Sequence, residues 1–198
     1  MAHHDLTLTP QLGPPAGRCE LVFDREHLTT VVRDAMLRAT SSLEISTADF
    51  KAMLVPASSQ DRAAPSVVEH LIRLARRGVE VRVMHSGVPS GPALTQLKAA
   101  SKKKALPGNL TIRRCPRLHA KAVVVDAGWL YLGSANLTGA GLGAKGPKRR
   151  NFEWGVASED PVLVDAVLGR FNDLWEGTHC AACGRRDVCP VPLEEPRL

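Results

Sequence analysis

Residues 118–138 read LHAKAVVVDAGWLYLGSANLT. The β-branched run and the glycine that follows it predict two strands, 119–125 and 129–132, joined by a tight turn. Because residues two apart on a strand point to the same face, we expect His119 and Lys121 to face the same way. An imidazole and an ammonium directed at one point suit a phosphate group, and burying them in an apolar strand without a partner would be costly. We therefore predict a functional site at this end of the strand.

Helical and strand patterns alternate along the rest of the chain. We expect helices at 26–40, 66–78, 93–104 and 161–175, and further strands at 42–50, 79–84, 110–114 and 151–157. The helix at 66–78 ends in a glycine and leads straight into a β-branched run, as in the αβ half of a βαβ unit. The predicted fold class is therefore α/β, with a mixed, largely parallel central sheet flanked by helices.

Length and composition favour one domain with a small appendage. We assign residues 1–20 to an N-terminal lead-in, 21–176 to the domain that carries the site, and 177–198 to a short Cys-rich C-terminal tail. Hydrophobic residues make up 44% and charged residues 23%, as in soluble globular proteins, and no apolar run reaches the length of about 18 residues that a membrane span needs. The N-terminus lacks the basic start and apolar core of a signal peptide. We expect a cytoplasmic protein without stable membrane insertion.

The chain is basic, with a formal net charge of +6 and a pI near 9.3. This charge favours polyanionic partners such as nucleic acid or an anionic membrane surface; a basic surface without such a partner is the alternative. Seven residues are candidates for nucleic-acid contacts: Lys102, Lys103, Lys104, Lys145, Lys148, Arg149 and Arg150. The three consecutive lysines also suit a solvated helix end, where they meet the helix dipole. The other four lie in a glycine-rich segment at 139–150, which is either a contact loop or an idle mobile one.

The polar residues of the stretch supply the groups that attack on phosphorus requires. A neutral imidazole, here that of His119, is a competent nucleophile. The ammonium of Lys121, the hydroxyl of Ser134 and the amide of Asn136 are donors that stabilise charge on non-bridging oxygens. Asp126 is the only acid of the stretch and lies seven positions after His119, which suits a structural or imidazole-orienting role better than metal binding.

The spacing of these residues resembles the HKD motif of the phospholipase D superfamily. The match consists of His119-x-Lys121-x4-Asp126 followed by Gly133-Ser134-x-Asn136. The sequences SLEISTADF and LARRGVEVRVM, and Asn151-x-Glu153 with Gly155, also resemble that family's surrounding elements, so the resemblance covers about residues 22–175. The chain is similar to the single-motif group of bacterial endonucleases and cardiolipin hydrolases.

The resemblance implies a phospholipase D-like fold and a two-histidine mechanism without a catalytic cofactor. One histidine attacks the phosphodiester to give a phosphohistidine, a second protonates the leaving alcohol, and water releases the product. Because the chain carries one such motif, the resemblance implies a homodimer with one composite site across a two-fold axis. It assigns His119 as nucleophile or acid, and Lys121 and Asn136 to phosphate binding. Ser134 is assigned to hydrogen bonding in the site, and Glu153 to orienting or tuning the partner's histidine. Asp126 is included as a sixth site residue.

These features predict a metal-independent phosphodiesterase. The basic charge favours a nuclease, because nucleic acid offers a repeated phosphodiester to several Lys and Arg contacts. One Tyr, three Trp and four Phe are few for base-stacking platforms, so sequence-specific reading is not expected. A phospholipid hydrolase acting on phosphatidylcholine or cardiolipin is the first alternative, and a catalytically silent nucleic-acid-binding module is the second. The choice between DNA and RNA stays open.

The tail carries a C-x2-C-x5-C arrangement formed by Cys180, Cys183 and Cys189. Clustered thiols in a cytoplasmic protein favour metal ligation over disulfides, with structural zinc as the first interpretation and an iron–sulfur cluster as the second. The fourth ligand is expected to be Cys19, or otherwise His179. A tail that holds no metal is the remaining alternative, and Cys115 is interpreted as a buried or spare thiol.

Overall fold

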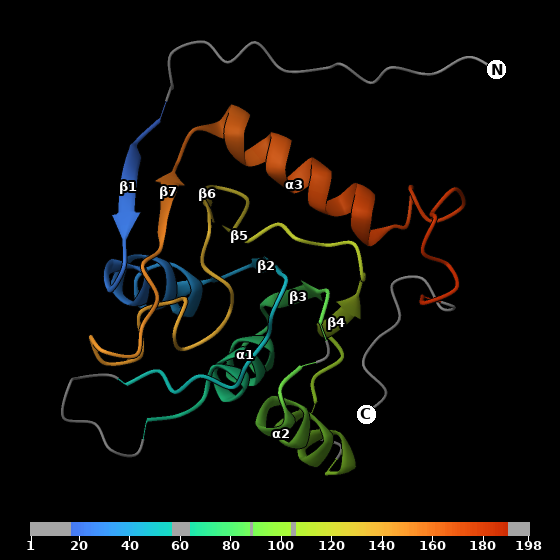
Figure 1. The fold of residues 1–198 in the computed structure, drawn as a ribbon, viewed down its shortest axis with the longest axis horizontal. Helices are drawn as coiled ribbons and strands as arrows, with labels where there is room; N and C mark the ends of the chain where they lie inside the picture. Colours follow the sequence, from blue (N-terminus) through green and yellow to red (C-terminus); the bar gives the residue numbers. More distant parts are fainter. Residues whose placement is uncertain (1–16, 57–63, 88, 104–105, 190–198) are drawn as a thin grey trace.

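Seven strands form one mixed sheet in the computed structural model of the chain, which describes residues 17–56, 64–87, 89–103 and 106–189 (Figure 1). Their bounds are β1 (Cys19–Phe23), β2 (Ser42–Thr47), β3 (Glu80–His85), β4 (Leu110–Arg114), β5 (Ala122–Val125), β6 (Trp129–Gly133) and β7 (Trp154–Ser158). The order across the sheet is β1-β7-β6-β5-β2-β3-β4. The β2–β3 and β3–β4 pairings are parallel and the other four are antiparallel. The mixed sheet is therefore confirmed, but its parallel part is smaller than predicted, because β5 and β6 form a hairpin and β7 pairs antiparallel with β6.

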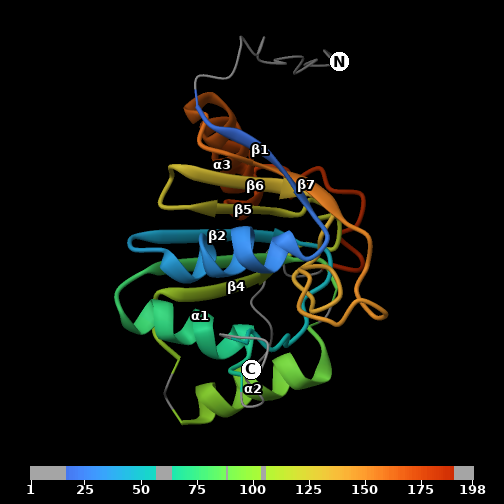
Figure 2. The same ribbon diagram turned by 90° about the vertical axis from the view of Figure 1, so that its left-hand side faces the viewer.

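Helices cover both faces of this sheet (Figure 2). α3 (Pro161–Trp175), whose predicted bounds are confirmed, packs against β2, β5 and β6 on one face. The other face is covered by the π-helix η1 (His27–Arg33), the 3-10 helix η2 (Met36–Arg38) and α1 (Val67–Arg76). α2 (Gly91–Lys102) packs on α1 and lies beyond the β3–β4 end of the sheet. The largest apolar core lies between the sheet and the η1–α1 layer.

The segment predicted as a single helix at 26–40 forms η1 and then η2. Its buried side chains come in pairs that recur every fourth residue: His27 and Leu28, Val31 and Val32, Ala35 and Met36. A π-helix has wider turns than an α-helix, and the amide of Asp34 accordingly donates to the carbonyl of Thr29 at 2.9 Å. The wider turn keeps these pairs on the sheet side, a difference that apolar spacing alone does not distinguish from an α-helix.

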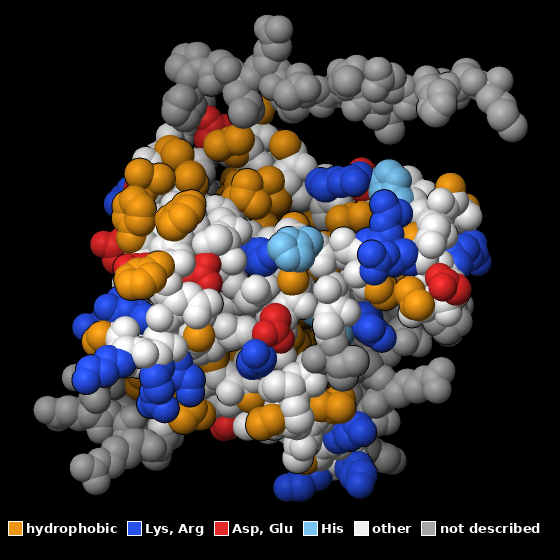
Figure 3. Space-filling view, viewed as in Figure 1, with side chains coloured by type: hydrophobic (Ala, Val, Ile, Leu, Met, Phe, Trp, Pro, Cys, Tyr) orange, Lys and Arg blue, Asp and Glu red, His pale blue; other side chains and the backbone are white. Residues whose placement is uncertain are grey.

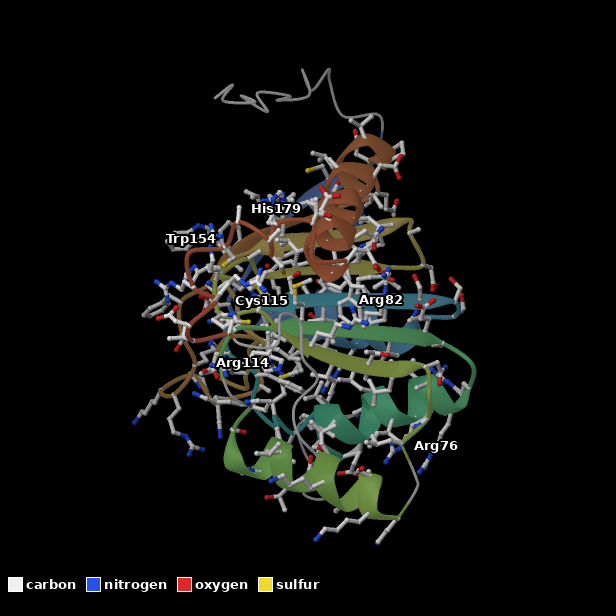
Figure 4. All side chains as sticks on the ribbon, turned by 90° about the vertical axis from the view of Figure 1, so that its right-hand side faces the viewer. Arg76, Arg82, Arg114, Cys115, Trp154 and His179 are labelled. Atoms are coloured by element: carbon white, nitrogen blue, oxygen red, sulfur yellow. The ribbon has the colours of Figure 1, made fainter. Side chains whose placement is uncertain are left out.

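A buried ion pair holds the C-terminal half of α3 on the sheet. Glu44 on β2 accepts a hydrogen bond from Arg82 on β3 at 3.0 Å, and the Glu44 side chain is 3% exposed. The Arg82 guanidinium also lies 5.2 Å from the ring centre of Phe171 and 5.6 Å from that of Trp175, both on α3. Burial raises the pKa of Glu44, and the Arg82 guanidinium opposes that rise. Figure 4 shows Arg82 on the strand layer beside the end of α3, which becomes one wall of the site described below.

Several boundaries differ from the predicted ones by one to three residues, as in β2, α1, α2 and β7. Two further differences concern β1 and β5. β1 includes Cys19 and Glu20, which the sequence pattern placed in the lead-in, and it forms the edge strand next to β7. The strand predicted to begin at residue 119 begins at Ala122, where the ladders to β2 and β6 end. Within the described ranges, no helix combines the length and the apolar composition that crossing a membrane requires.

Candidate active site

Five of the six predicted catalytic residues lie at one end of three adjacent strands. His119 and Lys121 precede β5, Ser134 and Asn136 follow β6, and Glu153 precedes β7. Because β5 and β7 both run antiparallel to β6, the two strand starts meet the end of β6 at the same edge of the sheet. The sheet topology therefore assembles the site from segments distant in sequence.

His119 and Lys121 lie in contact, as their spacing predicted, although the segment that carries them is not part of the strand. The ammonium of Lys121 lies 3.0 Å from Nδ1 and 3.3 Å from Nε2 of His119, and donates to the His119 carbonyl at 2.8 Å. The imidazole is exposed, so its reactive nitrogens are open to substrate. Partial burial lowers the pKa of Lys121, and the carboxylate of Glu153 opposes this effect. The pair therefore presents an imidazole and a cation at one point.

Glu153 is the buried anion of the site, with an exposed fraction of 8%. The hydroxyl of Ser134 donates to Oε2 of Glu153 in a short hydrogen bond, and Nδ2 of Asn151 donates to Oε1 at 2.9 Å. The backbone amide of Glu153 donates to the side chain of Asp24 at 3.0 Å, which ties the site to the loop after β1. Asn151 belongs to the Asn151-x-Glu153 pattern noted in the sequence, although no role was predicted for it. Asp24 is a supporting residue that the sequence did not single out, because its partner is set by the fold.

Asn136 joins the site to the end of β2. Its Oδ1 accepts from the amides of Ala48 and Asp49 at 3.0 and 3.1 Å, and from the hydroxyl of Thr47 at 3.3 Å. These bonds orient the amide, and among the described residues its Nδ2 group has no hydrogen-bond partner. A fixed, available N–H donor at the same edge of the sheet as His119 is suited to a phosphate oxygen.

Asp126 lies at the opposite end of β5 from His119, in the turn to β6. Its carboxylate accepts from the amides of Thr40, Ser41 and Ser42 and from the hydroxyls of Thr40 and Ser41, at 2.7 to 3.1 Å. Burial alone would raise the pKa of Asp126, but these hydrogen bonds outweigh it and hold that pKa well below its usual range. A structural and an imidazole-orienting role were considered for Asp126. Its contacts support the structural role, because they anchor the start of β2.

A buried histidine–tyrosine pair supports the site from below. Nε2 of His27 lies 2.9 Å from the hydroxyl of Tyr131, and Nδ1 lies 2.9 Å from the carbonyl of Asp24. The tyrosine ring fits beneath Gly133 and Gly155, where an added Cβ at either position would collide with it. Burial raises the pKa of Tyr131 to about 12. The motif glycine and Gly155 thus make room for a tyrosine, a pairing that no local pattern predicts.

A cavity of about 500 Å³ opens beside His119. Its apolar wall includes Leu118, Ala120 and Leu174, from the segment before β5 and from α3. Arg117, Arg170 and His179 line the same cavity, with Arg170 Nη1 2.6 Å from His179 Nε2. Figure 4 shows His179 on the tail turns above Cys115. The predicted tail is therefore a wall of the candidate site, which the sequence did not indicate.

The predicted nucleic-acid contacts fall in two separate places. Lys102 and Lys103 are exposed at the end of α2, beyond the β3–β4 end of the sheet, and Lys104 lies outside the described residues. The segment 139–150 packs back on itself through hydrogen bonds such as that from the amide of Lys145 to the carbonyl of Gly139, with Leu142 buried. This segment exposes three of its four basic residues, Lys145, Lys148 and Arg149, and half-buries Arg150. Neither group is among the residues that line the cavity beside His119.

The predicted metal ligands do not all come together. Cys180, Cys183 and Cys189 line a small cavity with Cys115, whereas Cys19 lies on the opposite edge strand, β1, paired with Ser158. The choice of Cys19 as fourth ligand is therefore wrong for this structure, because β1 and β4 are the two edges of the sheet and Cys115 follows β4. His179 lines the neighbouring, larger cavity.

Comparisons with known proteins find the same architecture. A family model described as cardiolipin synthase, PLD-like domain, matches residues 32–175. Among solved structures, Nuc from Salmonella typhimurium, a phospholipase D family member, is 17% identical with a TM-score of 0.61, covering 92% of this chain and 99% of that one. NucT from Helicobacter pylori is 14% identical with a TM-score of 0.59, covering 81% and 96%. Phosphatidylserine synthase from Haemophilus influenzae Rd KW20 is 18% identical with a TM-score of 0.54, covering 81% and 39%. A search of curated protein sequences finds no significant match.

Proposed function

The chain belongs to the PLD-like domain family of phosphodiesterases, and we propose that it is a homodimeric nuclease that cleaves nucleic acid through a phosphohistidine. One observation carries this proposal: His119, Lys121, Asn136 and the Ser134–Glu153 pair converge at one edge of the sheet, as half of a two-histidine site. The proposal draws each chemical role from a group at this edge.

The reaction we propose has two steps. A nitrogen of His119 attacks phosphorus, so that a P–N bond forms while the P–O bond to the leaving alcohol breaks. The leaving oxygen takes its proton from His119 of the partner subunit. Water then attacks phosphorus, its proton passes back to that second imidazole, and the P–N bond breaks to release the phosphate product. Lys121 and the Nδ2 group of Asn136 stabilise the charge that builds on the non-bridging oxygens.

An uncovered apolar surface beside the site supports the dimer. α3 covers the sheet at Leu130 but not at Leu132, and Leu21 and Phe23 on β1 share that uncovered face with Trp154 on β7. Trp154 is 65% exposed, and its amide and carbonyl both bond to Ser134 of the site, at 3.2 and 3.1 Å. Figure 3 shows hydrophobic side chains gathered over β1 and β7. A second copy docked on this apolar face would cover it and bring its own His119 towards the first.

The positive charge of the chain favours nucleic acid as the substrate. Arg117 and Arg170 line the cavity beside His119, so cations flank the position of the reacting phosphate, as a polyanionic backbone requires. A phospholipid remains the second candidate, because the cavity wall is largely apolar.

The test is hydrolysis of single- and double-stranded DNA and RNA in EDTA, beside vesicles of phosphatidylcholine and of cardiolipin. We expect nucleic-acid cleavage, an acid-labile phosphohistidine on the peptide that contains His119, and a loss of about a thousandfold or more in His119→Ala. His70→Ala, on α1 and away from the site, is the matched control. Lipid turnover with inert nucleic acid would refute the substrate, and strict dependence on added magnesium would refute the mechanism.

The dimer surface has its own test. Trp154→Glu places a charge in the apolar face, so we expect a monomer by light scattering and loss of activity. Val162→Glu, on the exposed side of α3, is the matched control and should leave the dimer intact. A wild-type protein that is monomeric and fully active would overturn the composite site.

A further inference from the structure

Four of the five cysteines line one small cavity, although one of them is far from the others in sequence. Cys115 follows β4, while Cys180, Cys183 and Cys189 belong to the turns after α3. All five cysteines are thiols rather than disulfides. The cavity measures about 30 Å³, which is room for a single ion and not for a substrate. The fold therefore brings four thiols to the wall of one small cavity.

The tail is folded into turns that present these thiols. The amide of Cys180 donates to the carbonyl of Gly177 at 2.8 Å, and the amide of Cys183 to that of Cys180 at 3.2 Å. A C-x2-C turn of this kind is common among structural zinc sites. On the other side, the amide of Cys115 donates to the carbonyl of His85 at 2.8 Å, which fixes the fourth thiol to the sheet.

Positive charge surrounds this cluster. Arg117, Arg185 and Arg186 line the same cavity, and Nη1 of Arg117 donates to Sγ of Cys183 at 3.6 Å. A divalent ion held by four thiolates carries a net charge of −2, so arginines around it compensate the excess negative charge.

We propose that Cys115, Cys180, Cys183 and Cys189 bind one structural zinc ion, which joins the C-terminal tail to the segment that leads into His119. Among the described residues, no group of three or more His, Cys, Asp or Glu side chains is placed so that it could hold a metal ion as it stands, so the four thiols line one cavity without forming a finished site. The ion would therefore draw the four thiols together as it binds, which couples metal binding to ordering of the tail. Zinc rather than a hard cation follows from the all-sulfur donor set.

Such an ion would also shape the candidate active site. Cys115, Cys180 and Cys183 line the large cavity as well, on the wall that faces His119. The amide of Leu118 donates to the carbonyl of Cys115 at 2.9 Å, so the turn that holds Cys115 is the turn that leads to His119. Zinc would thus fix a wall of the substrate cavity without touching the reacting groups.

The experiment measures the metal itself and does not depend on any activity. Full-length wild type and serine variants are purified in zinc-containing medium, washed with a weak chelator and assayed by elemental mass spectrometry. We expect about one zinc per chain in wild type and Cys19→Ser, and at least about tenfold less in Cys115→Ser and Cys183→Ser. Cys19→Ser is the matched control because Cys19 lies on the opposite edge of the sheet. Cobalt loaded in place of zinc should show thiolate charge-transfer absorption, which Cys183→Ser weakens.

Loss of zinc through misfolding can be told apart from loss of zinc through removal of a ligand. Cys183 lies on a turn outside the sheet, so its replacement leaves the strand ladders intact, and circular dichroism verifies this for each variant. Four results would overturn the proposal: a folded wild type that takes up neither zinc nor cobalt, zinc lost in Cys19→Ser but kept in Cys115→Ser, iron with acid-labile sulfide, or a native disulfide among the four cysteines.

Discussion

Replacing Asp126 by Asn separates a structural from a catalytic role for the aspartate of the motif. Asp126 adopts φ 52°, in the left-handed region that Asn tolerates, so this change removes the carboxylate without adding backbone strain, as Ala would. Five donor groups of residues 40–42 donate hydrogen bonds to the carboxylate. In the Asn variant, the side-chain NH₂ group replaces one of the two acceptor oxygens, so it faces some of these donors and their hydrogen bonds are lost. Hydrogen bonds to a charged acceptor contribute about 1.5–3 kcal/mol each. Because the site is partly open to water and the losses are not additive, we expect the free energy of unfolding to fall by about 2–3 kcal/mol in total.

The assay is urea unfolding at neutral pH, followed by tryptophan fluorescence, with Asp165→Asn on the exposed side of α3 as the control. The sign of the pH dependence is fixed by the lowered pKa of Asp126. Its contribution is complete above the unfolded pKa of about 3.9 and is lost as the pH falls further, so the difference from wild type stays constant between about pH 5 and 8. Activity per folded molecule should change by less than about twofold, because the carboxylate lies at the other end of β5. A variant that is as stable as wild type but inactive would refute this reasoning.

Two further predictions concern the support of the site. Gly155→Ala should lower the free energy of unfolding by about 1–3 kcal/mol, because its Cβ collides with the ring of Tyr131, whereas Gly169→Ala on α3 meets open space and should stabilise slightly in the same urea assay. Burial lowers the pKa of His27 and of His85, so the unfolded chain binds protons near pH 6.5 that the folded chain does not. Stability should therefore fall as the pH drops below about 6.5, by up to about 1.4 kcal/mol per pH unit for each histidine; thermal unfolding that is flat or rises between pH 7 and 5 would contradict this.

Local sequence patterns predicted the helices whose N-termini are marked by a capping residue or a proline. α3 begins at Pro161, after Asp160 caps it by accepting from the amides of Val162 and Leu163, and its bounds are confirmed to the residue. α1 likewise follows the Ser66 cap. The proximity of His119 to Lys121 was also predictable, since two residues of an extended segment point the same way wherever the ladder starts.

Non-local partners left no such signal. His27 and Tyr131 are 104 positions apart, and nothing in either neighbourhood indicates the other. Cys115 and Cys183 line the same cavity because the segment after β4 and the turns after α3 lie together in the fold, which depends on strand order. β1 was missed because a short edge strand after a Pro/Gly-rich stretch carries a weak periodic pattern. Spacing predicts which residues carry the chemistry, but only the topology selects their neighbours.

Mixing subunits tests the composite site most directly. If the site needs His119 from both copies, every dimer that contains one His119→Ala chain is inactive. When equal amounts of wild-type and variant chains are allowed to exchange, random pairing leaves about a quarter of the dimers with two histidines, so about a quarter of the activity of the same total of wild type should remain. Chains that work alone would keep about half. The control is a mixture in which the subunits have not exchanged, and differently tagged subunits show whether exchange has occurred. If half of the activity remains after verified exchange, one motif suffices and the shared site is refuted.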